Sequence, residues 1–271
     1  MIDESFRRPN CYLLKVKKMS SEVRAELERF VSIDFETTGR DPREDRVTEI
    51  GIIVFEGGEI VERYGQLVNP GRPIPHEVTQ VTGIRDEDVA NMPRFQEVAD
   101  EVIRRVEGQY LLAYNADYDV TVLRSELGRI GKTVELRGVI DPLPFAWQHL
   151  RRAKKTKSAR LGDVAQFLGI DLENAHRATD DAEAAGNVFL KIREFVVGLP
   201  SAMRDVLDEQ KALSIRMEET FARFRSNRGG GGNVLNAADV VIELGAGFVR
   251  GEESDPIRYL FRRLPDVRDI R

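Results

Sequence analysis

The stretch Val31-Ser-Ile-Asp-Phe-Glu-Thr-Thr-Gly39 decides the fold. Its apolar, β-rich residues predict a buried strand that begins near Phe30. Because side chains two residues apart on a strand point to the same face, Asp34 and Glu36 project side by side while Phe35 faces the packing. Adjacent carboxylates repel each other unless a cation lies between them, and hard oxygen ligands favour Mg²⁺ or Mn²⁺. An ordinary strand end with two solvated acids is the alternative for this motif alone.

A second acidic segment follows another predicted strand, Tyr110–Tyr114. The turn at 115–117 leads into a predicted helix over 118–129. Asp119 falls in the first turn of this helix, where the helix dipole favours a negative charge. Simple complementation of the dipole is the alternative role for this residue.

A third segment combines an acid with a histidine. Ala178–Phe195 is rich in alanine and has apolar residues at helical spacing, which predicts an amphipathic helix lying close against the sheet. Asp181 falls near the start of this helix and His176 just before it. The other two histidines, His76 in a predicted loop and His149 on a predicted helix, are given no role.

These three segments, in this order, resemble the DnaQ-like 3′–5′ exonucleases, the DEDD family named after its four acids. The first family motif, Asp-x-Glu-Thr-Thr-Gly, is matched by residues 34–39. The second, His-Asn-Ala-x-Phe-Asp, is matched by residues 114–119 except for tyrosines at its first and fifth positions. The third, His-Arg-Ala-x-x-Asp, is matched by residues 176–181. This last match favours the histidine branch, because the tyrosine branch would carry Tyr at the position of Arg177.

The resemblance covers roughly residues 28–198 and implies an α/β fold, a ribonuclease H-like mixed β-sheet flanked by helices. The hydrophobic pattern agrees, since Val47–Phe55 and Glu59–Val68 predict two strands joined by the hairpin signal Gly57-Gly58. Further along the chain, the pattern predicts helices over Phe95–Val106 and from Leu161, and a strand near Val139-Ile140. The next residue, Asp141, matches a structural aspartate of the family.

The resemblance also implies a catalytic site with two divalent metal ions, Mg²⁺ or Mn²⁺. The implied metal ligands are Asp34, Glu36, Asp119 and Asp181. Asp34 would bridge both ions, Glu36 and Asp181 would complete the site that holds the attacking water, and the remaining acid would serve the second ion. His176 would act as general base, a role that suits its unperturbed pKa of about 6.5.

Substrate contacts are expected around the same motifs. The predicted substrate-binding residues are Thr37, Thr38, Gly39, Asn115, Tyr118, Lys157 and Arg160. The stretch from Arg151 to Arg160 holds six basic residues in ten and would track the phosphates of a single strand. A solvated loop is the alternative for this stretch, and a place in the core is the alternative for Tyr118.

Composition sets further limits. The chain of 271 residues has a net charge of −5, which does not oppose nucleic-acid binding, because a metal-filled acidic site and a local basic stretch can coexist. One cysteine, Cys11, excludes an internal disulfide and a cysteine-rich zinc site, and the cytoplasm is the expected compartment. We expect no membrane association, because the chain contains neither a run of about 20 apolar residues nor a signal-peptide pattern.

Five parts are expected along the chain: an N-terminal extension with a short helix (1–27), the exonuclease domain (28–198), a helix (199–228), a Gly-rich linker (229–233) and a small C-terminal segment of unknown role (234–271). The helix has apolar residues near one face, which would pack on the core or dock a partner. The last part predicts a strand over 240–244 and a short basic helix over 257–263. Self-association or a DNA polymerase subunit could involve residues 199–271.

The expected function is therefore 3′–5′ exonuclease activity that releases nucleoside 5′-monophosphates, acting on single strands or duplex 3′ ends. DNA proofreading or repair is the first expectation and RNA 3′-end trimming the second. A non-catalytic nucleic-acid-binding or scaffold module on the same fold is a third. Retention of all five catalytic positions counts against this third reading.

Overall fold

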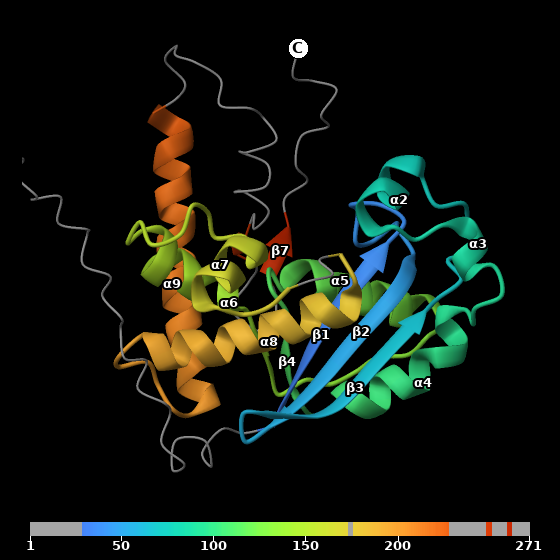
Figure 1. Cartoon of the computed structure of the whole chain (residues 1–271), viewed down its shortest axis with the longest axis horizontal. Helices are drawn as coiled ribbons and strands as arrows, with labels where there is room; N and C mark the ends of the chain where they lie inside the picture. The colour runs from blue at the N-terminus through green and yellow to red at the C-terminus, as the bar shows by residue number, and fades with distance from the viewer. Residues whose placement is uncertain (1–28, 173–175, 228–247, 251–258, 262–271) are drawn as a thin grey trace, which may run out of the picture.

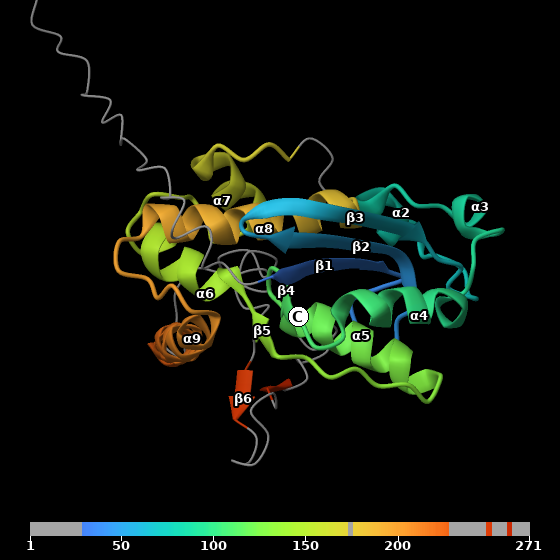
Figure 2. The same cartoon turned by 90° about the horizontal axis from the view of Figure 1, so that it is seen from below.

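A computed structural model of the chain describes residues 29–172, 176–227, 248–250 and 259–261. These residues form a five-stranded sheet in the order β3-β2-β1-β4-β5, with helices on both faces (Figures 1 and 2). A separate two-stranded sheet pairs β6 with β7. The predicted mixed sheet flanked by helices is confirmed.

The middle strand of the sheet is β1, Phe30–Thr37. It pairs antiparallel with β2, Val47–Glu56, and parallel with β4, Tyr110–Leu112. Outside these strands, β3, Glu59–Leu67, is antiparallel to β2, and β5, Gly138–Ile140, is parallel to β4. Nearly every residue of β2 is buried, whereas edge strand β3 alternates between exposed and half-buried positions.

The helices are α2 His76–Thr82, α3 Asp86–Val89, α4 Phe95–Val106, α5 Asp117–Arg129, α6 Pro142–Ala146, α7 Leu161–Leu168, α8 Ala178–Phe195 and α9 Met203–Asn227, with a π-helical turn η1 at Trp147–Arg151. Helices α4 and α5 cover one face of the sheet and α8 covers the other (Figure 2). The predicted helices over 95–106 and 178–195 have the expected bounds.

The two faces of the sheet enclose two separate hydrophobic cores. On the α8 side, Phe30 stacks on Phe55 with ring centroids 4.7 Å apart and meets Phe189 edge-on at 5.6 Å. On the α4 and α5 side, Val31 and Phe35 of the same strand are buried. Alternate side chains of β1 therefore enter opposite cores, which holds this strand rigidly at the centre of the molecule.

Helix α8 begins in direct contact with the backbone of β2. A Cβ atom added to Gly51 would lie 2.1 Å from the carbonyl carbon of Ala178. The small side chains of Ala178, Ala182 and Ala185 are buried, as the alanine-rich pattern predicted. The close approach fixes the start of α8, and with it the segment that carries His176.

Helix α9 covers the edge of the sheet at β5. The side-chain amide of Gln210 accepts a hydrogen bond from the Asp141 backbone N at 2.8 Å and donates to the Val139 carbonyl at 3.2 Å. Val206 and Leu213 are buried in the core on the α8 side, so the predicted packing of this helix on the core is confirmed. In the described ranges, no helix is long and apolar enough to span a lipid bilayer.

Three predicted elements differ in the structure. Strand β4 ends at Leu112 rather than Tyr114, because the chain turns at Asn115, which has a φ of 65°. His76 begins helix α2 instead of lying in a loop, since Pro75 provides a φ of −57° just before the helix. Near the C-terminus, Tyr259–Phe261 forms strand β7 where a helix over 257–263 was predicted.

The partner of β7 is β6, Phe248–Arg250, in antiparallel register. Residues 257–263 contain the short apolar run Tyr259–Phe261 between arginines, and so short a run does not distinguish a helix from a strand. In the structure this run pairs with β6. The predicted short helix of the N-terminal extension, the linker at 229–233 and the strand at 240–244 lie outside the described residues.

Two glycine substitutions, one at the contact of β2 with α8 and one on α5, should have opposite effects on stability. Gly51→Ala should lower the free energy of unfolding by about 1–3 kcal/mol, because the added methyl group overlaps the backbone of α8. Gly128→Ala, in helix α5 with no atom within 4 Å of the added Cβ, should raise it by up to about 1 kcal/mol. Urea unfolding measures both, and equal stability of the Gly51 variant and the wild type would contradict the packing.

Candidate active site

The four predicted acidic ligands come together where β1 ends. Asp34 and Glu36 are the two partly exposed positions of this strand. An oxygen of Asp119, in the first turn of α5, accepts a hydrogen bond from the Phe35 backbone N at 3.1 Å. Asp181, in the first turn of α8, lies near enough to raise the pKa of both β1 acids. Side chains from three separate segments therefore meet in one site.

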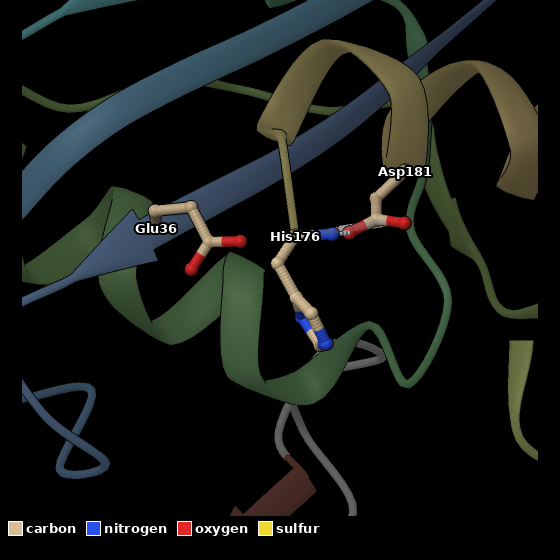
Figure 3. Close-up of side chains that lie close together, drawn as sticks. All are labelled: Glu36, His176 and Asp181. Carbon is tan, nitrogen blue, oxygen red and sulfur yellow. Dashed lines mark hydrogen bonds between the residues drawn. The ribbon is translucent and has the colours of Figure 1, made fainter. Parts of the chain in front are cut away.

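His176 lies beside this cluster. Its backbone N donates to Asp181 Oδ2 at 2.9 Å, and its φ of 71° turns the chain into α8. Glu36, His176 and Asp181 each offer one ligand atom, and these three atoms lie within 4.8 Å of one another (Figure 3). The His176 side chain is exposed, so water can reach the imidazole next to the carboxylates.

Burial and mutual repulsion raise the pKa values of the clustered carboxyl groups. Burial raises the pKa of Asp34 well above its ordinary value, and the neighbouring Asp119 and Asp181 raise it further. Burial and the charge of Asp181 raise the pKa of Glu36 to about 8. Burial also raises the pKa of Asp119 to about 8, although the Phe35 N–H opposes this shift. The cluster therefore holds more negative charge than its protein surroundings neutralise.

This charge imbalance fits the binding of divalent cations. The donor set consists of carboxylate oxygens with one imidazole, which suits Mg²⁺ or Mn²⁺ better than a thiolate-preferring metal. A cation between the carboxylates would remove the repulsion that raises their pKa values. The residues present thus fit the ions that the resemblance implies.

An ion pair between a buried glutamate and a half-exposed arginine, which the sequence motifs did not identify, fixes the start of α8. Glu49 lies opposite Glu36 in the register of β1 and β2 and is 3% exposed. Its carboxylate accepts hydrogen bonds from Arg177 Nη2 at 2.7 Å and from the Ala178 backbone N at 3.1 Å. Arg177 directly follows His176, so this pair positions the histidine. The only sequence signal was an acid within the apolar run of β2.

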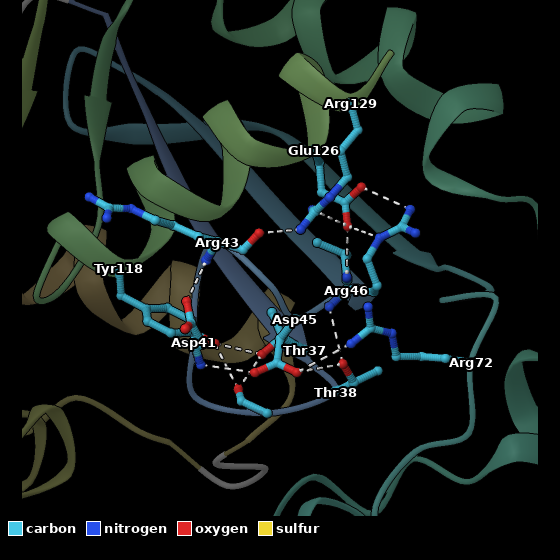
Figure 4. A network of polar contacts seen from close by, with 12 residues as sticks. Thr37, Thr38, Asp41, Arg43, Asp45, Arg46, Arg72, Tyr118, Glu126 and Arg129 are labelled. Carbon is cyan, nitrogen blue, oxygen red and sulfur yellow. Dashed lines mark hydrogen bonds and ion pairs between the residues drawn. The ribbon is translucent and has the colours of Figure 1, made fainter. Parts of the chain in front are cut away.

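The turn after β1 is held by hydrogen bonds within the protein. The hydroxyl groups of Thr37 and Tyr118 are 2.5 Å apart, and Tyr118 also donates to the Gly39 carbonyl at 3.0 Å (Figure 4). The Thr38 hydroxyl donates to Asp45 Oδ1 at 3.0 Å. These contacts connect the turn to α5 and fix its shape next to the acids. Contact of these residues with a substrate stays a prediction.

Glu126 ties the loop behind this turn to α5. Its side chain is 1% exposed and accepts hydrogen bonds from Arg46 Nε at 2.8 Å and from the Val47 backbone N at 3.2 Å (Figure 4). Arg129, one turn further along α5, also pairs with Glu126 at 3.3 Å. The helix that carries Asp119 and the loop next to the site therefore form one unit, which no local sequence pattern indicated.

The remaining predicted binding residues lie in the turn before α5 and in the basic loop before α7. Asp141 accepts hydrogen bonds from the backbone N atoms of Asn115 at 2.9 Å and Ala116 at 3.3 Å, which supports its predicted structural role. Burial raises the pKa of Asp141 to about 6. Lys157 is exposed in the basic loop, and Arg160 lies at the start of α7, so neither belongs to the group of acids.

Comparison with known proteins relates the chain to exonucleases. A protein-family model described as Exonuclease matches residues 31–189. The chain belongs to this exonuclease family, and its relatives are DnaQ-like 3′–5′ exonucleases, as the motifs implied.

Three curated relatives illustrate the match. The 3′–5′ exonuclease DinG of Bacillus subtilis (strain 168) is 33% identical over 183 residues, which are 64% of this chain and 18% of DinG. A PolC-type DNA polymerase III of Thermotoga maritima is 36% identical over 167 residues, which are 62% of this chain and 12% of that protein. The DNA polymerase III subunit epsilon of Treponema pallidum is 35% identical over 160 residues, which are 59% of this chain and 74% of the subunit. The match thus spans under a fifth of the first two relatives.

Solved structures confirm the fold. Escherichia coli exonuclease I in complex with a dA16 oligonucleotide aligns with a TM-score of 0.55 at 21% identity, over 62% of this chain and 41% of that one. Exonuclease X in complex with 5′ overhanging duplex DNA aligns with a TM-score of 0.50 at 22% identity, over 66% of this chain and 99% of that one. The ribonuclease H-like expectation is therefore confirmed at the level of the fold.

The raised pKa values predict an inverted pH dependence of stability without metal. Glu36 and Asp119 have pKa values of about 8 in the folded chain and about 4 in the unfolded chain. Between these two pH values the folded state therefore binds more protons than the unfolded state. The contribution of this cluster to stability is fully present below about pH 4 and is lost as the pH rises through about 8.

In EDTA, melting temperatures should therefore fall between pH 6 and pH 8.5, and this fall should be smaller in Glu36→Gln. Added Mn²⁺ should stabilise the wild type more at pH 8.5 than at pH 6, because the ligands must lose their protons to bind it. Equal pH profiles of wild type and Glu36→Gln would contradict the assignment.

Proposed function

We propose that the chain is a metal-dependent 3′–5′ exonuclease that removes nucleotides from the 3′ ends of DNA. The observation that carries this proposal is the convergence of four carboxylates from β1, α5 and α8 beside an exposed imidazole. A non-catalytic binding module has no need for carboxylates that repel one another in a partly buried site. Membership of the exonuclease family supports the same reaction class.

The residues that would hold two Mg²⁺ or Mn²⁺ ions are Asp34, Glu36, Asp119 and Asp181. When bound, such ions supply Lewis-acid stabilisation of the attacking and leaving oxygens of a phosphodiester. The protein holds the carboxylate ligands in fixed positions. The Phe35 N–H orients Asp119, and the His176 N–H orients Asp181.

His176 is the proposed general base. Its side chain lies beside Glu36 and Asp181 and is open to water, so it can take the proton of a water molecule that attacks the terminal phosphodiester. The Glu49–Arg177 pair holds the adjacent backbone in place during this step. The products are a nucleoside 5′-monophosphate and a strand shortened by one nucleotide.

DNA is the proposed substrate, and proofreading or repair the proposed role. DNA polymerase III proteins are among the relatives, and exonuclease I aligns in complex with a DNA oligonucleotide. The turn at Thr37–Gly39, Tyr118 and the basic loop with Lys157 and Arg160 are the proposed contacts to the strand. Association with a polymerase subunit, self-association and a cytoplasmic location remain predictions.

Digestion of end-labelled oligonucleotides tests the proposal. Single- and double-stranded DNA and RNA of the same sequence are incubated with Mg²⁺, Mn²⁺ or EDTA. We expect 5′-labelled DNA to shorten one nucleotide at a time, only with a metal, and faster than RNA. If RNA shortens faster than DNA, RNA is the substrate instead of DNA. If neither metal supports digestion, the proposed function is refuted.

Asp34→Asn should reduce the rate of nucleotide release by at least about 10³-fold, because a neutral amide removes a metal-binding charge at the centre of the cluster. The same variant should melt at a higher temperature than the wild type in EDTA, since one repelling charge is gone. Asp208→Asn, at an exposed position on α9, is the matched control and should change neither quantity. Wild-type activity of Asp34→Asn would disprove the ligand assignment.

His176→Ala should lower the rate by roughly 10²–10⁴-fold, the usual scale for loss of a general base. His76→Ala, which removes an exposed histidine bonded only to Gln80 among the described contacts, should leave the rate unchanged. In rates measured from pH 5.5 to 9, the fall toward low pH should become weaker in the His176 variant alone, because a general base acts only when it is unprotonated. An unaltered pH–rate profile in that variant would exclude the proposed role.

A further inference from the structure

Two tyrosines just before Asp119 have hydroxyl groups that bind backbone carbonyls of other segments. Tyr114 donates a hydrogen bond to the Ala159 carbonyl at 2.6 Å, and Tyr118 donates one to the Gly39 carbonyl at 3.0 Å. These tyrosines stand at the two positions where the sequence departs from the second family motif, which has His and Phe there. A phenylalanine ring has no hydroxyl, so the contact with Gly39 depends on tyrosine at this position.

The two carbonyls belong to two different loops. Ala159 lies in the basic loop before α7, and Gly39 lies in the loop of residues 38–46 that joins β1 to β2 (the β1–β2 loop). Figure 1 shows the loop before α7 on one side of α5, and the end of β1 with α2 on the other. The short segment 114–118, which leads directly to the proposed ligand Asp119, therefore anchors both loops.

Each anchored carbonyl lies next to an exposed cation. Arg40 directly follows Gly39, and Lys157 precedes Ala159 by two residues. Neither Arg40 nor Lys157 forms an ion pair or a side-chain hydrogen bond with a described residue, whereas Arg46 of the same β1–β2 loop is paired with Glu126. A strand of nucleic acid carries a phosphate at every nucleotide, and such phosphates are the usual partners of exposed Lys and Arg side chains.

Other hydrogen bonds give both loops a defined shape. In the β1–β2 loop, Asp45 accepts hydrogen bonds from the Thr38 hydroxyl at 3.0 Å and from the Asp41 backbone N at 2.9 Å. In the basic loop, the Ser158 hydroxyl donates to Asp163 Oδ2 at 2.6 Å. The tyrosine contacts then fix these two shaped loops relative to α5, and with them the positions from which the two cations extend.

We propose that Tyr114 and Tyr118 are positioning residues, whose hydroxyl groups hold Lys157 and Arg40 at a fixed separation so that these cations bind two phosphates of one substrate strand. This inference rests on the proposed function and extends it, because it adds Arg40 to the substrate site and gives both hydroxyls a role. The hydroxyls act through the loops, while the ring of Tyr118 remains a proposed contact to the strand.

Limited proteolysis tests the anchoring without any need for activity. Trypsin cuts after Lys and Arg, so both loops contain cleavage sites. Tyr114→Phe should speed cleavage in the basic loop about three- to tenfold, the factor for one lost neutral hydrogen bond, and Tyr118→Phe should do so in the β1–β2 loop. Tyr64→Phe is the matched control, because its hydroxyl on β3 has no hydrogen bond with a described residue. Wild-type cleavage rates of both loops in the first two variants would overturn the anchoring.

Steady-state cleavage of single-stranded dT₁₂ tests the role in binding. Tyr114→Phe and Tyr118→Phe should each raise KM about three- to tenfold and change kcat less than about twofold, because the cations lie outside the group of acids. Arg40→Gln and Lys157→Gln should also raise KM. Each should reduce the slope of log KM against log salt concentration by about 0.7, the value for one phosphate contact with a single strand.

A double-mutant cycle separates positioning from a general loss of stability. If Tyr114 acts through Lys157, the double variant should have the KM of Lys157→Gln alone, and the same relation should hold for Tyr118 with Arg40. Additive effects on KM, or wild-type KM values in both tyrosine variants, would refute the inference while leaving the exonuclease function intact. Failure of the wild type to cleave dT₁₂ would instead refute the proposed function, and the role in substrate binding with it.

Discussion

Repulsion among carboxylates at the end of β1 is the constraint on which the rest of the structure depends. A partly buried site can hold this much negative charge only if the backbone around it is rigid, because any freedom would let the acids separate. Two hydrophobic cores enclose β1, and α8 touches the backbone of β2 at Gly51. The free energy of this packing keeps the acids together, and bound cations would remove their mutual repulsion.

Two ion pairs hold the segments next to the acids in place. Glu49 with Arg177 fixes the start of α8, and Glu126 with Arg46 fixes the loop beside α5. Both glutamates are almost fully buried, and burial of each carboxylate would be unfavourable without the charge of its arginine. They contact elements that carry the acids and the histidine, which explains how residues far apart in the chain keep a constant geometry. Helix α9 extends the same body to the edge of β5 through Gln210.

Local patterns were enough to predict most of the sheet and the long helices, and the resemblance to a known family implied the cluster of acids. Alternation placed Asp34 and Glu36 on one face of β1, and three motifs in order pointed to their convergence. Local patterns could not predict contacts between distant segments, because nothing in the spacing of residues indicates that Glu49 pairs with Arg177. The strand Tyr259–Phe261 was missed because its partner lies in another segment, and the π-helical turn at η1 has no simple sequence signature.

The central claim is that the carboxylates of β1, α5 and α8 hold two cations in one site. The most direct test is a crystal structure of the full chain soaked in Mn²⁺, with anomalous differences measured at the manganese edge. The account predicts two anomalous peaks, both in contact with Asp34 and each with at least one further oxygen from Glu36, Asp119 or Asp181. Peaks elsewhere on the protein, or none at this cluster at saturating Mn²⁺ and pH 8, would contradict it.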